Sequence, residues 1–561
     1  MDTRQFVITA NKAGGFLCLG VDSRYAGWYA PVQGTLYKIF HDIHVAGKIQ
    51  HYYQDAGYVH RIREHAHERM LLPLHASALV YSLDQHVPFE LVLDVRQPYD
   101  NRRWGKSYSI THERGKLIIQ FTKTHDARDQ DTLSGEEYHL FLVIEGDEDL
   151  HFKKIEEWIP YYYPLDEQRH SPPYDGSVFK AVQLVARRII LAVSDDKDAA
   201  CALAERITQQ HLTLERLRKS YFQGMSPASA NLSEHLVKSG RKKNVLPGYP
   251  WAFAPNALAD AQCARALLLD TQIEDVKFML YEQLMQEIQT PWSVLGWHAF
   301  AWHSVFEFLS RNHRLPEYFS PDEIKEITAR LEALHDSVQQ QYIHDGLIHA
   351  DDDPWMPDLP SPRLDHQALY ACFLELLHKI TGNDAYAEAR HRFLAGVRER
   401  FTIPVSSLSL RHATPNIFVA AYLCPHLYPG PLWEEAFEGA LSELWLPWGG
   451  ISTLSTGHPL FCSTHSGEVT TSHFHGDSWY WINNLTALAL HRVNAKRFKK
   501  YIDAIHTAST EELLHSGALG HHAQISSASH CRSEGCWSYA PSAALYIELM
   551  NELNHGHRKP H

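Results

Sequence analysis

The feature that most constrains this chain is a change in the spacing of its apolar residues near Asp195. Before that point, short runs of β-branched and aromatic residues alternate with turn residues, as in antiparallel strands that are buried on one face. After it, apolar residues recur about every 3.6 positions in long blocks, which is the spacing of amphipathic helices. The sequence therefore predicts an antiparallel β-sandwich followed by an all-helical region.

The clearest predicted strands cover residues 34–40, 88–95, 116–121, 138–145 and 188–193. The predicted helices cover residues 257–269, 273–288, 297–310, 321–342, 365–381, 385–401, 415–423, 432–444, 478–493, 495–507 and 541–554. Short loops alternate with long, aromatic-rich loops between these helices, as expected of an (α/α)6 barrel with six inner and six outer helices. We therefore predict an N-terminal β-sandwich domain over 1–196, a helical linker over 197–245 and an (α/α)6 barrel over 246–561.

Composition and charge narrow the classes of partner. The formal net charge is −14, and Lys and Arg cluster only at 241–243, whereas nucleic acids and anionic membranes favour such clusters. The sequence shows no signal segment and no run of 18 apolar residues, so we expect a cytoplasmic protein that does not bind a membrane. The 39 histidines and eight cysteines show neither paired metal-ligand spacing nor a disulfide scaffold. We therefore expect no metal and no cofactor, and the oligomeric state stays open.

One loop combines acidic residues with an indole ring. The stretch 346–370 contains Trp355 and four nearby acids, Asp351, Asp352, Asp353 and Asp358. Carboxylates can transfer protons or hold sugar hydroxyls, and an aromatic face stacks on the C–H groups of a pyranose. A solvated acidic loop before a helix is the alternative interpretation. Tryptophans are frequent in the other long loops as well, which favours a sugar-binding cleft where these loops meet.

Seven short motifs occur in the order found in one enzyme family. They are Asn11-Lys-Ala-Gly-Gly-Phe16 with Arg24-Tyr25, Gly248-Tyr-Pro-Trp251, Gly346-Leu-Ile-His349 with Trp355-Met356 and Pro362-Arg363, Pro415-Asn416, Leu446-Pro-Trp-Gly-Gly-Ile-Ser-Thr-Leu-Ser455, His475-Gly-Asp-Ser-Trp-Tyr-Trp481, and Gly535-Cys536 through Ser542. This order resembles the glycogen debranching enzymes, the amylo-α-1,6-glucosidases. The resemblance implies a β-sandwich followed by an (α/α)6 barrel of the six-hairpin glycosidase type, and an oligosaccharide or polysaccharide ligand. It also implies substrate-binding residues at Tyr249, Trp251, Trp297, Trp355, Arg363, His475, Trp479, Gln524 and Trp537.

The chain departs from that family where the reacting sugar should be held. Pro357 stands at the position of the general acid, with Asp358 one residue later, and Gln524 stands at the position of the general base. The sugar-holding carboxylate after the Gly248–Trp251 motif is missing, and so is the one expected near 295–298. These departures place the catalytic role of the family's positions in doubt.

Three functions follow from this pattern. In the first, the protein is an inverting glycosidase, which needs two carboxyl groups about 6.5 to 9.5 Å apart. Asp358, with Asp353 as its substitute, is the expected acid. The base is expected to be Asp477, Glu534 or Glu468.

In the second, the barrel is a catalytically degenerate glucan-binding or regulatory protein, because a bound sugar needs only stacking and hydrogen bonds. In the third, Asp365-His366 and His475-Gly-Asp477 serve proton transfers of the epimerase or lyase kind, because a fold does not fix a function. In each case we predict that Trp251, Trp355, His475, Trp479 and Gln524 converge on one concave pocket.

Overall fold

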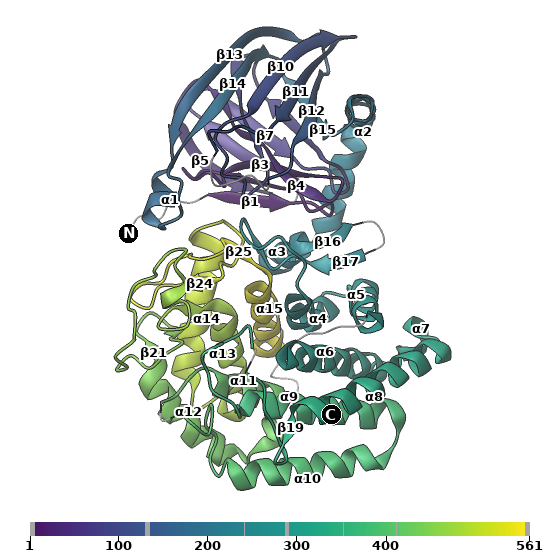
Figure 1. Ribbon diagram of the computed structural model, residues 1–561, viewed down its shortest axis with the longest axis vertical. Coiled ribbons are helices and arrows are strands. Elements are labelled where there is room, and N and C mark those ends of the chain that lie inside the picture. Colours follow the sequence, from purple (N-terminus) through teal and green to yellow (C-terminus); the bar gives the residue numbers. More distant parts are fainter. Residues whose placement is uncertain are drawn as a thin grey trace. The chain divides into compact units, whose positions relative to one another are not determined.

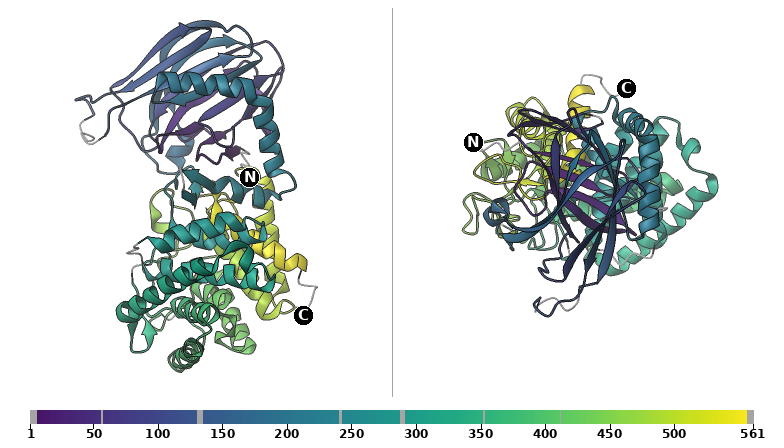
Figure 2. Two further views of the ribbon diagram at one scale, coloured as in Figure 1. Left: turned by 90° about the vertical axis from the view of Figure 1, so that its right-hand side faces the viewer. Right: turned by 90° about the horizontal axis from the view of Figure 1, so that it is seen from above.

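The computed structural model describes residues 6–55, 57–129, 135–239, 242–286, 291–351, 353–410 and 412–555 (Figures 1 and 2). Asp352, one of the four acids of the loop 346–370, lies outside these residues. The chain divides into two compact units. The first comprises residues 1–226, 233–240 and 516–519, and the second comprises residues 227–232, 241–515 and 520–561. The division of the sequence at 196 and 245 stays a prediction.

The first unit is a sandwich of two antiparallel sheets, as predicted. One sheet has the strand order β1 (Val7–Ala10), β2 (Phe16–Leu19), β3 (Gly27–Val32), β4 (Thr35–Val45), β9 (Pro88–Arg96), β14 (Asp175–Val185), β13 (His151–Tyr162). The other has the order β10 (Lys106–Glu113), β11 (Lys116–Lys123), β12 (Tyr138–Gly146), β15 (Arg188–Ser194), β8 (Ala78–Leu83), β7 (His67–Leu71), β6 (Val59–Arg63), β5 (Ile49–Gln54). Apolar side chains from both sheets form one core that includes Trp28, Phe40, Leu91, Phe121 and Leu191.

A long helix covers the outer face of the second sheet (Figure 1). Helix α2 (Lys197–Phe222) begins after Asp196, whose carboxylate accepts a hydrogen bond from the Ala199 N–H and so caps the helix. Its small residues Ala200 and Ala204 let it approach β12, β15 and β8 closely. The short helix α1 (Pro164–Gln168) lies between β13 and β14 in the chain.

The second unit is an (α/α)6 barrel, also as predicted. Its inner helices are α4 (Ala257–Leu269), α6 (Trp292–Arg311), α9 (Leu364–Thr381), α11 (Asn416–Leu423), α13 (Tyr480–Asn494) and α15 (Ala540–His555). Each inner helix packs on the next, and α15 packs on α4, so the ring closes. The helices that precede them in the chain are α3 (Pro227–His235), α5 (Ile273–Met285), α8 (Pro321–Tyr342), α10 (Asp384–Arg400), α12 (Gly430–Leu444) and α14 (Lys499–His515). The four-residue α7 (Leu315–Tyr318) lies between α6 and α8.

Inner and outer helices differ in how much of their surface is apolar. Helix α8 starts with a capping box between Ser320 and Glu323 and buries only one stripe, formed by Ile327, Leu331, His335 and Val338. All eight residues of α11 are buried, as expected of a helix enclosed on every side.

Charged groups fill the end of the barrel where the inner helices terminate. Glu548 on α15 accepts a hydrogen bond of 2.8 Å from the Tyr422 hydroxyl and lies 3.3 Å from the Arg265 guanidinium. Arg492 pairs with Glu552 beside them. Burial raises the pKa of Glu548, although both arginines oppose that shift. This network occupies one end of the barrel, and the long loops that precede the inner helices lie at the other.

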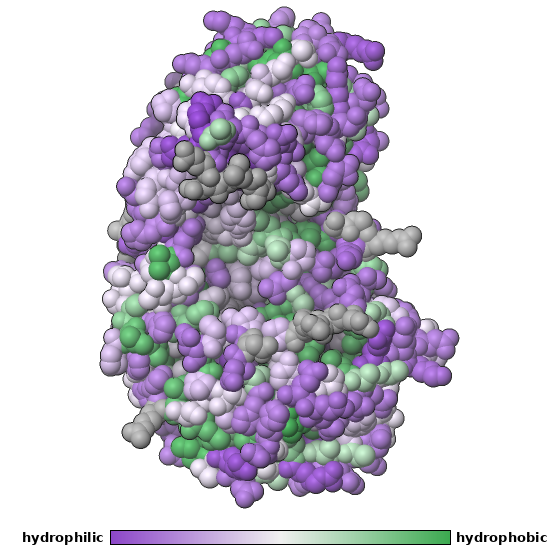
Figure 3. Space-filling view, viewed as in Figure 1, coloured by the Kyte–Doolittle hydropathy of each residue, from purple (hydrophilic) through white to green (hydrophobic). Residues whose placement is uncertain are grey.

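The exposed surface in Figure 3 is mostly hydrophilic, with hydrophobic residues scattered between polar ones. Within the described residues, no helix combines the length and the apolar character needed to cross a membrane. All eight cysteines are free thiols, so the fold does not depend on a disulfide.

Candidate functional site

Short antiparallel strand pairs join the long loops at the other end of the barrel. β23 (Ser478–Trp479) pairs with β24 (Ile525–Ser526), which ties the loop before α13 to the loop before α15. β18 (Gly248–Tyr249) pairs with β25 (Ser538–Tyr539), which ties the loop before α4 to the same segment. The inner helices all run in one direction, because an outer helix returns the chain before each of them. Their preceding loops therefore meet at one end.

Four aromatic side chains, from two of these loops and the first turn of α13, form a cluster, which we call the aromatic cluster: Trp355, Phe474, Trp479 and Trp481. The Trp355 ring meets Trp479 at 5.2 Å and Trp481 at 4.9 Å, in both cases edge to face, and Phe474 stacks on Trp479 at 5.8 Å. Trp355 is only 8% exposed, so its indole forms part of a buried wall and does not present an open face on which a sugar could stack. Its buried Nε1–H has no hydrogen-bond partner among the described residues.

Asp353 anchors one side of the aromatic cluster. Its Oδ1 accepts a hydrogen bond from the Trp355 N–H at 2.9 Å, and its Oδ2 accepts one from His366 Nε2 at 2.9 Å. The Arg363 guanidinium lies 2.7 Å from the same Oδ2 and also binds both oxygens of Asp365. These residues are buried, and Asp365 accepts a further hydrogen bond from Asn416 at 2.8 Å.

The partners of Asp353 fix its charge state. Burial alone would raise the pKa of this carboxyl group, but the hydrogen bond from His366 and the charge of Arg363 outweigh burial, so the pKa lies below its ordinary value. Asp353 is therefore ionised at neutral pH. The Nδ1 of His366 is buried and has no hydrogen-bond partner in the described part of the chain.

Asp477 occupies an equivalent position two residues before Trp479. Its fully buried Oδ2 accepts hydrogen bonds of 2.7 Å from His465 Nδ1 and from the Ser472 hydroxyl. Its other oxygen, Oδ1, and the Nε2 of His465 are buried without a partner among the described residues. The His465 ring stacks on His473 at 5.4 Å, and the His473 carbonyl accepts the Trp479 Nε1–H. Buried polar atoms with unused capacity mark a place where a ligand, ion or water is expected.

A glycine next to Asp477 allows two segments of the loop to come into close contact. Gly476 has φ +155°, and a Cβ built on it would lie 2.0 Å from the Cys462 carbonyl oxygen. The Cys462 N–H donates to the His475 carbonyl at 2.6 Å, so the two segments of this loop are in close contact. Only glycine permits this approach, and it fixes the position of Asp477.

Gln524 is held by the loop before α15. Its side-chain oxygen accepts a hydrogen bond from the Cys536 N–H at 2.9 Å, and its backbone carbonyl accepts one from the Tyr480 N–H. Trp537 follows Cys536 and meets Trp251 edge to face at 4.7 Å. Gln524, Trp251 and Trp537 are thus joined by contacts to the segment that contains Trp479.

The remaining predicted residues occupy different surroundings. Tyr249 is fully buried in β18. Trp297 lies on α6, and its ring centre is 6.4 Å from that of Trp481 in the aromatic cluster. His475 is half-buried and bonds to the Thr471 carbonyl at 2.8 Å. Asp358 is exposed in a turn, so the burial expected for a general acid is found at Asp353 instead. Glu534 is half-buried and pairs through its backbone with Ile525, whereas Glu468 is exposed.

The contacts bring Trp355, Trp479 and Gln524 to one end of the barrel, with Trp251 joined through Trp537. His475 belongs to the same loop as Asp477. A concave pocket formed by these residues stays a prediction. The sequence offered a signal for His366, which directly follows Asp365, but offered none for His465, which lies in a loop without a regular motif.

Two groups of side chains contain metal-ligand atoms that lie within 4.8 Å of one another. The group Asp353, Asp365 and His366 already holds the Arg363 guanidinium, whose positive charge opposes a cation there. The group His465, His473 and Asp477 contains no such charge, and its two imidazoles and carboxylate are donors that zinc accepts.

No family model matches the sequence, and no curated protein matches it either. Solved structures do match. The chain is similar to a bacterial glucoamylase complexed with acarbose, at 10% sequence identity and a TM-score of 0.61, covering 98% of this chain and 94% of that one. This chain has the glucoamylase fold.

A GH63 mannosylglycerate hydrolase from Thermus thermophilus matches 58% of this chain and 99% of its own, at 11% identity and a TM-score of 0.41. A D-mannose isomerase matches the same share of this chain and 94% of its own, at 10% identity and a TM-score of 0.40. Identities this low say nothing of the reaction.

Proposed function

We propose that this protein is an inverting glycoside hydrolase that acts on an α-glucan or α-glucoside, of the amylo-α-1,6-glucosidase type, with Asp477 as its general base. The observation that carries the proposal is the buried Asp477 carboxylate, which keeps one oxygen unpaired beside the aromatic cluster. An inverting base must accept a proton from the attacking water. Oδ1 has the free lone pairs for that step, while His465 and Ser472 hold Oδ2 and fix the carboxylate orientation.

The acid is assigned to Asp358. Asp353 is the poorer donor because Arg363 and His366 keep it ionised, and an acid must carry a proton at neutral pH. Asp358 lies three residues beyond Trp355 in an exposed turn, where a bound saccharide would cover it. Asp353 then positions Trp355 and His366 rather than donating a proton.

The test is hydrolysis of isomaltose and maltose by the full chain, with the anomer of the released glucose followed by NMR. We expect release of the inverted β-anomer. Asp477→Asn and Asp358→Asn should each lower kcat by about 10²-fold or more while the affinity for the saccharide is kept. Asp336→Asn, on the exposed face of α8, is the matched control and should leave kcat unchanged. Full activity in Asp477→Asn would remove it as the base.

A specific observation favours one second candidate, a saccharide-binding protein without hydrolytic activity. Gln524 stands where the resembled family has its base, and its amide is fixed by Cys536 and cannot take a proton. Saccharide binding without turnover of either disaccharide would support this candidate and contradict the hydrolase.

A further inference from the structure

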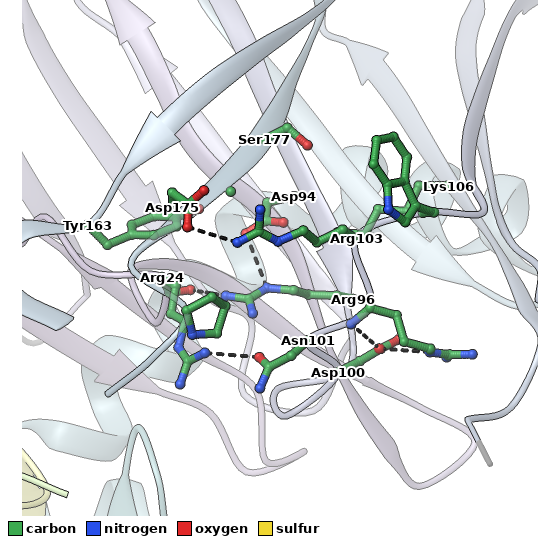
Figure 4. Close-up of a pocket in the computed structure, with 14 residues that line it drawn as sticks. Arg24, Asp94, Arg96, Asp100, Asn101, Arg103, Lys106, Tyr163, Asp175 and Ser177 are labelled. Atoms are coloured by element: carbon green, nitrogen blue, oxygen red, sulfur yellow. Dashed lines mark hydrogen bonds and ion pairs between the residues drawn. The ribbon is translucent and has the colours of Figure 1, made fainter. Parts of the chain in front are cut away.

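A pocket in the first unit is lined by an unusual number of cationic side chains for a protein of net charge −14 (Figure 4). The pocket encloses about 210 Å³ between β9, β10, β14 and the segment that precedes β3. Figure 4 shows the guanidinium groups of Arg24, Arg96 and Arg103 directed into one region of this pocket.

Two of the cations are neutralised by carboxylates of the pocket wall. The Arg102 guanidinium binds both oxygens of Asp100, each at 2.8 Å. Arg103 binds Asp175 at 2.8 Å at the exposed rim. These pairs shape the wall and leave no net charge for a ligand.

The other cations are compensated less completely. Arg24 is 4% exposed, and within the described residues its guanidinium donates hydrogen bonds only to neutral oxygens, those of Asn101, Tyr25 and Ser171. Its Nε forms a long ion pair of 3.9 Å with Asp166, whose carboxylate already accepts hydrogen bonds from the Ser23 hydroxyl and the Arg24 backbone N–H. Arg96 shares the Asp94 carboxylate with the buried ammonium group of Lys38. Its Nη1 has no hydrogen bond among the described residues.

Lys106 is the clearest donor without a partner. No acceptor in the described part of the chain hydrogen-bonds its ammonium group, although the side chain lines the pocket beside Arg96. Burial lowers the pKa of Lys106 and Arg96 adds to that shift, while the carboxylates of Asp94, Asp100 and Asp129 oppose it. An anion near Lys106 and Arg96 would relieve both the lost hydration and the repulsion between them.

An aromatic wall stands next to these donors. Trp104 lines the pocket and is 44% exposed, with Arg128 at 3.9 Å over its ring. Charged donors that fix a ligand, combined with an exposed aromatic wall, are typical of a site for a small polar molecule that has an apolar face. A sugar residue that carries an oxyanion has both properties.

We propose that this pocket binds a saccharide residue that carries a carboxylate or phosphate group, with Lys106 and Arg96 as donors to the oxyanion and Trp104 against the sugar ring. This site is separate from the aromatic cluster and does not depend on hydrolysis there. The oxyanion supplies acceptors for the unused donors, and the ring supplies C–H groups for the indole.

Calorimetric titration of the full chain tests the proposal with four probes: glucose 6-phosphate, glucuronate, inorganic phosphate and glucose. We expect glucose 6-phosphate or glucuronate to bind at least tenfold more tightly than either inorganic phosphate or glucose, and the tighter of the two identifies the oxyanion. Equal affinity for inorganic phosphate and glucose 6-phosphate would overturn the role of the sugar. No binding of any anion at 10 mM would overturn the site.

Three variants separate the parts of the site. Lys106→Met should weaken binding of the anionic sugar by about tenfold or more, the scale of a hydrogen bond to a charged group. Lys48→Met, an exposed lysine of the same unit, removes the same charge and should leave affinity unchanged. Trp104→Ala, at an exposed position, should weaken binding of the sugar phosphate and leave binding of inorganic phosphate unaltered. Unchanged affinity in both Lys106→Met and Trp104→Ala would refute the assignment.

Discussion

Asp353→Asn distinguishes a carboxylate that anchors the aromatic cluster from a carboxylic acid that donates a proton. A neutral acid resembles asparagine in shape and charge, so its replacement would change stability little. The ionised Asp353 lies 2.7 Å from Arg363 and accepts hydrogen bonds from His366 and the Trp355 N–H. Asparagine keeps one acceptor oxygen but removes the negative charge.

The expected loss follows from what Arg363 retains. Breaking a buried ion pair costs about 3–5 kcal/mol when the remaining charge is left uncompensated. Arg363 still binds both oxygens of Asp365, so the loss should be smaller, near the scale of hydrogen bonds to charged groups. We expect the free energy of unfolding of the second unit to fall by about 2–3 kcal/mol at pH 7.

The pH dependence of this loss in stability gives an independent check that Asp353 is ionised in the folded protein. The pKa of Asp353 is lowered in the folded protein, so its contribution is complete above the unfolded pKa of about 3.9 and is lost as pH falls through the folded pKa. The difference between wild type and variant should therefore be full at pH 7 and shrink below about pH 4.

Urea unfolding followed by tryptophan fluorescence is the assay, because all tryptophans except Trp28, Trp104 and Trp158 lie in the second unit. Asp336→Asn, whose side chain is 73% exposed, is the control and should stay within about 0.5 kcal/mol of wild type. An unchanged unfolding midpoint in Asp353→Asn at pH 7 would refute the ionised anchor and make Asp353 a candidate acid again.

Three further predictions concern the barrel. Burial raises the pKa of Asp260 to about 7, so between about pH 4 and 7 the folded state holds a proton that the unfolded state has lost. The free energy of unfolding therefore falls as pH rises through that window. In Asp260→Asn this contribution to the pH dependence should vanish, as measured by unfolding from pH 5 to 8. Gly476→Ala places a methyl group against the Cys462 carbonyl. We expect increased protease cleavage of residues 456–478 and loss of saccharide binding. Gly457→Ala is the control and should behave as wild type, because a Cβ at Gly457 meets no neighbouring atom. If the chain binds saccharide without turnover, Gln524→Glu combined with Pro357→Asp should yield measurable isomaltose hydrolysis. No hydrolysis by that double variant would mean that more than the acid and base has diverged.

The sequence predicted the fold because periodicity depends on which faces are buried. The run at 88–95 lies in β9, and the run at 34–40 lies in β4 from its second residue on; the inward residues of both strands belong to the sandwich core. Helix boundaries were less accurate where burial is complete. Helix α6 begins at Trp292, five residues before the predicted start, because nearly every residue of this inner helix is buried and no polar face marks its beginning.

The candidate site was predictable in composition but not in arrangement. Acids next to Trp355 were apparent, yet nothing in the sequence separates the buried Asp353 from the exposed Asp358 five residues later. That difference arises because Arg363, at the start of α9, draws Asp353 inward while the turn after Met356 leaves Asp358 in solvent. The pairing of His465 with Asp477 likewise depends on the path of a loop that has no periodicity to read.

The two halves of the aromatic cluster share one design, and that design constrains the ligand. In Asp353-Pro-Trp355 and Asp477-Ser-Trp479, a buried aspartate precedes an indole by two residues and accepts a hydrogen bond from a histidine. Among the described residues, the unused polar atoms of these two halves include one donor, Trp355 Nε1, and three acceptors, His366 Nδ1, His465 Nε2 and Asp477 Oδ1. A ligand with several hydroxyl groups, each able to donate and to accept, satisfies such a mixed set better than a purely anionic ligand, which brings no donors for the three acceptors.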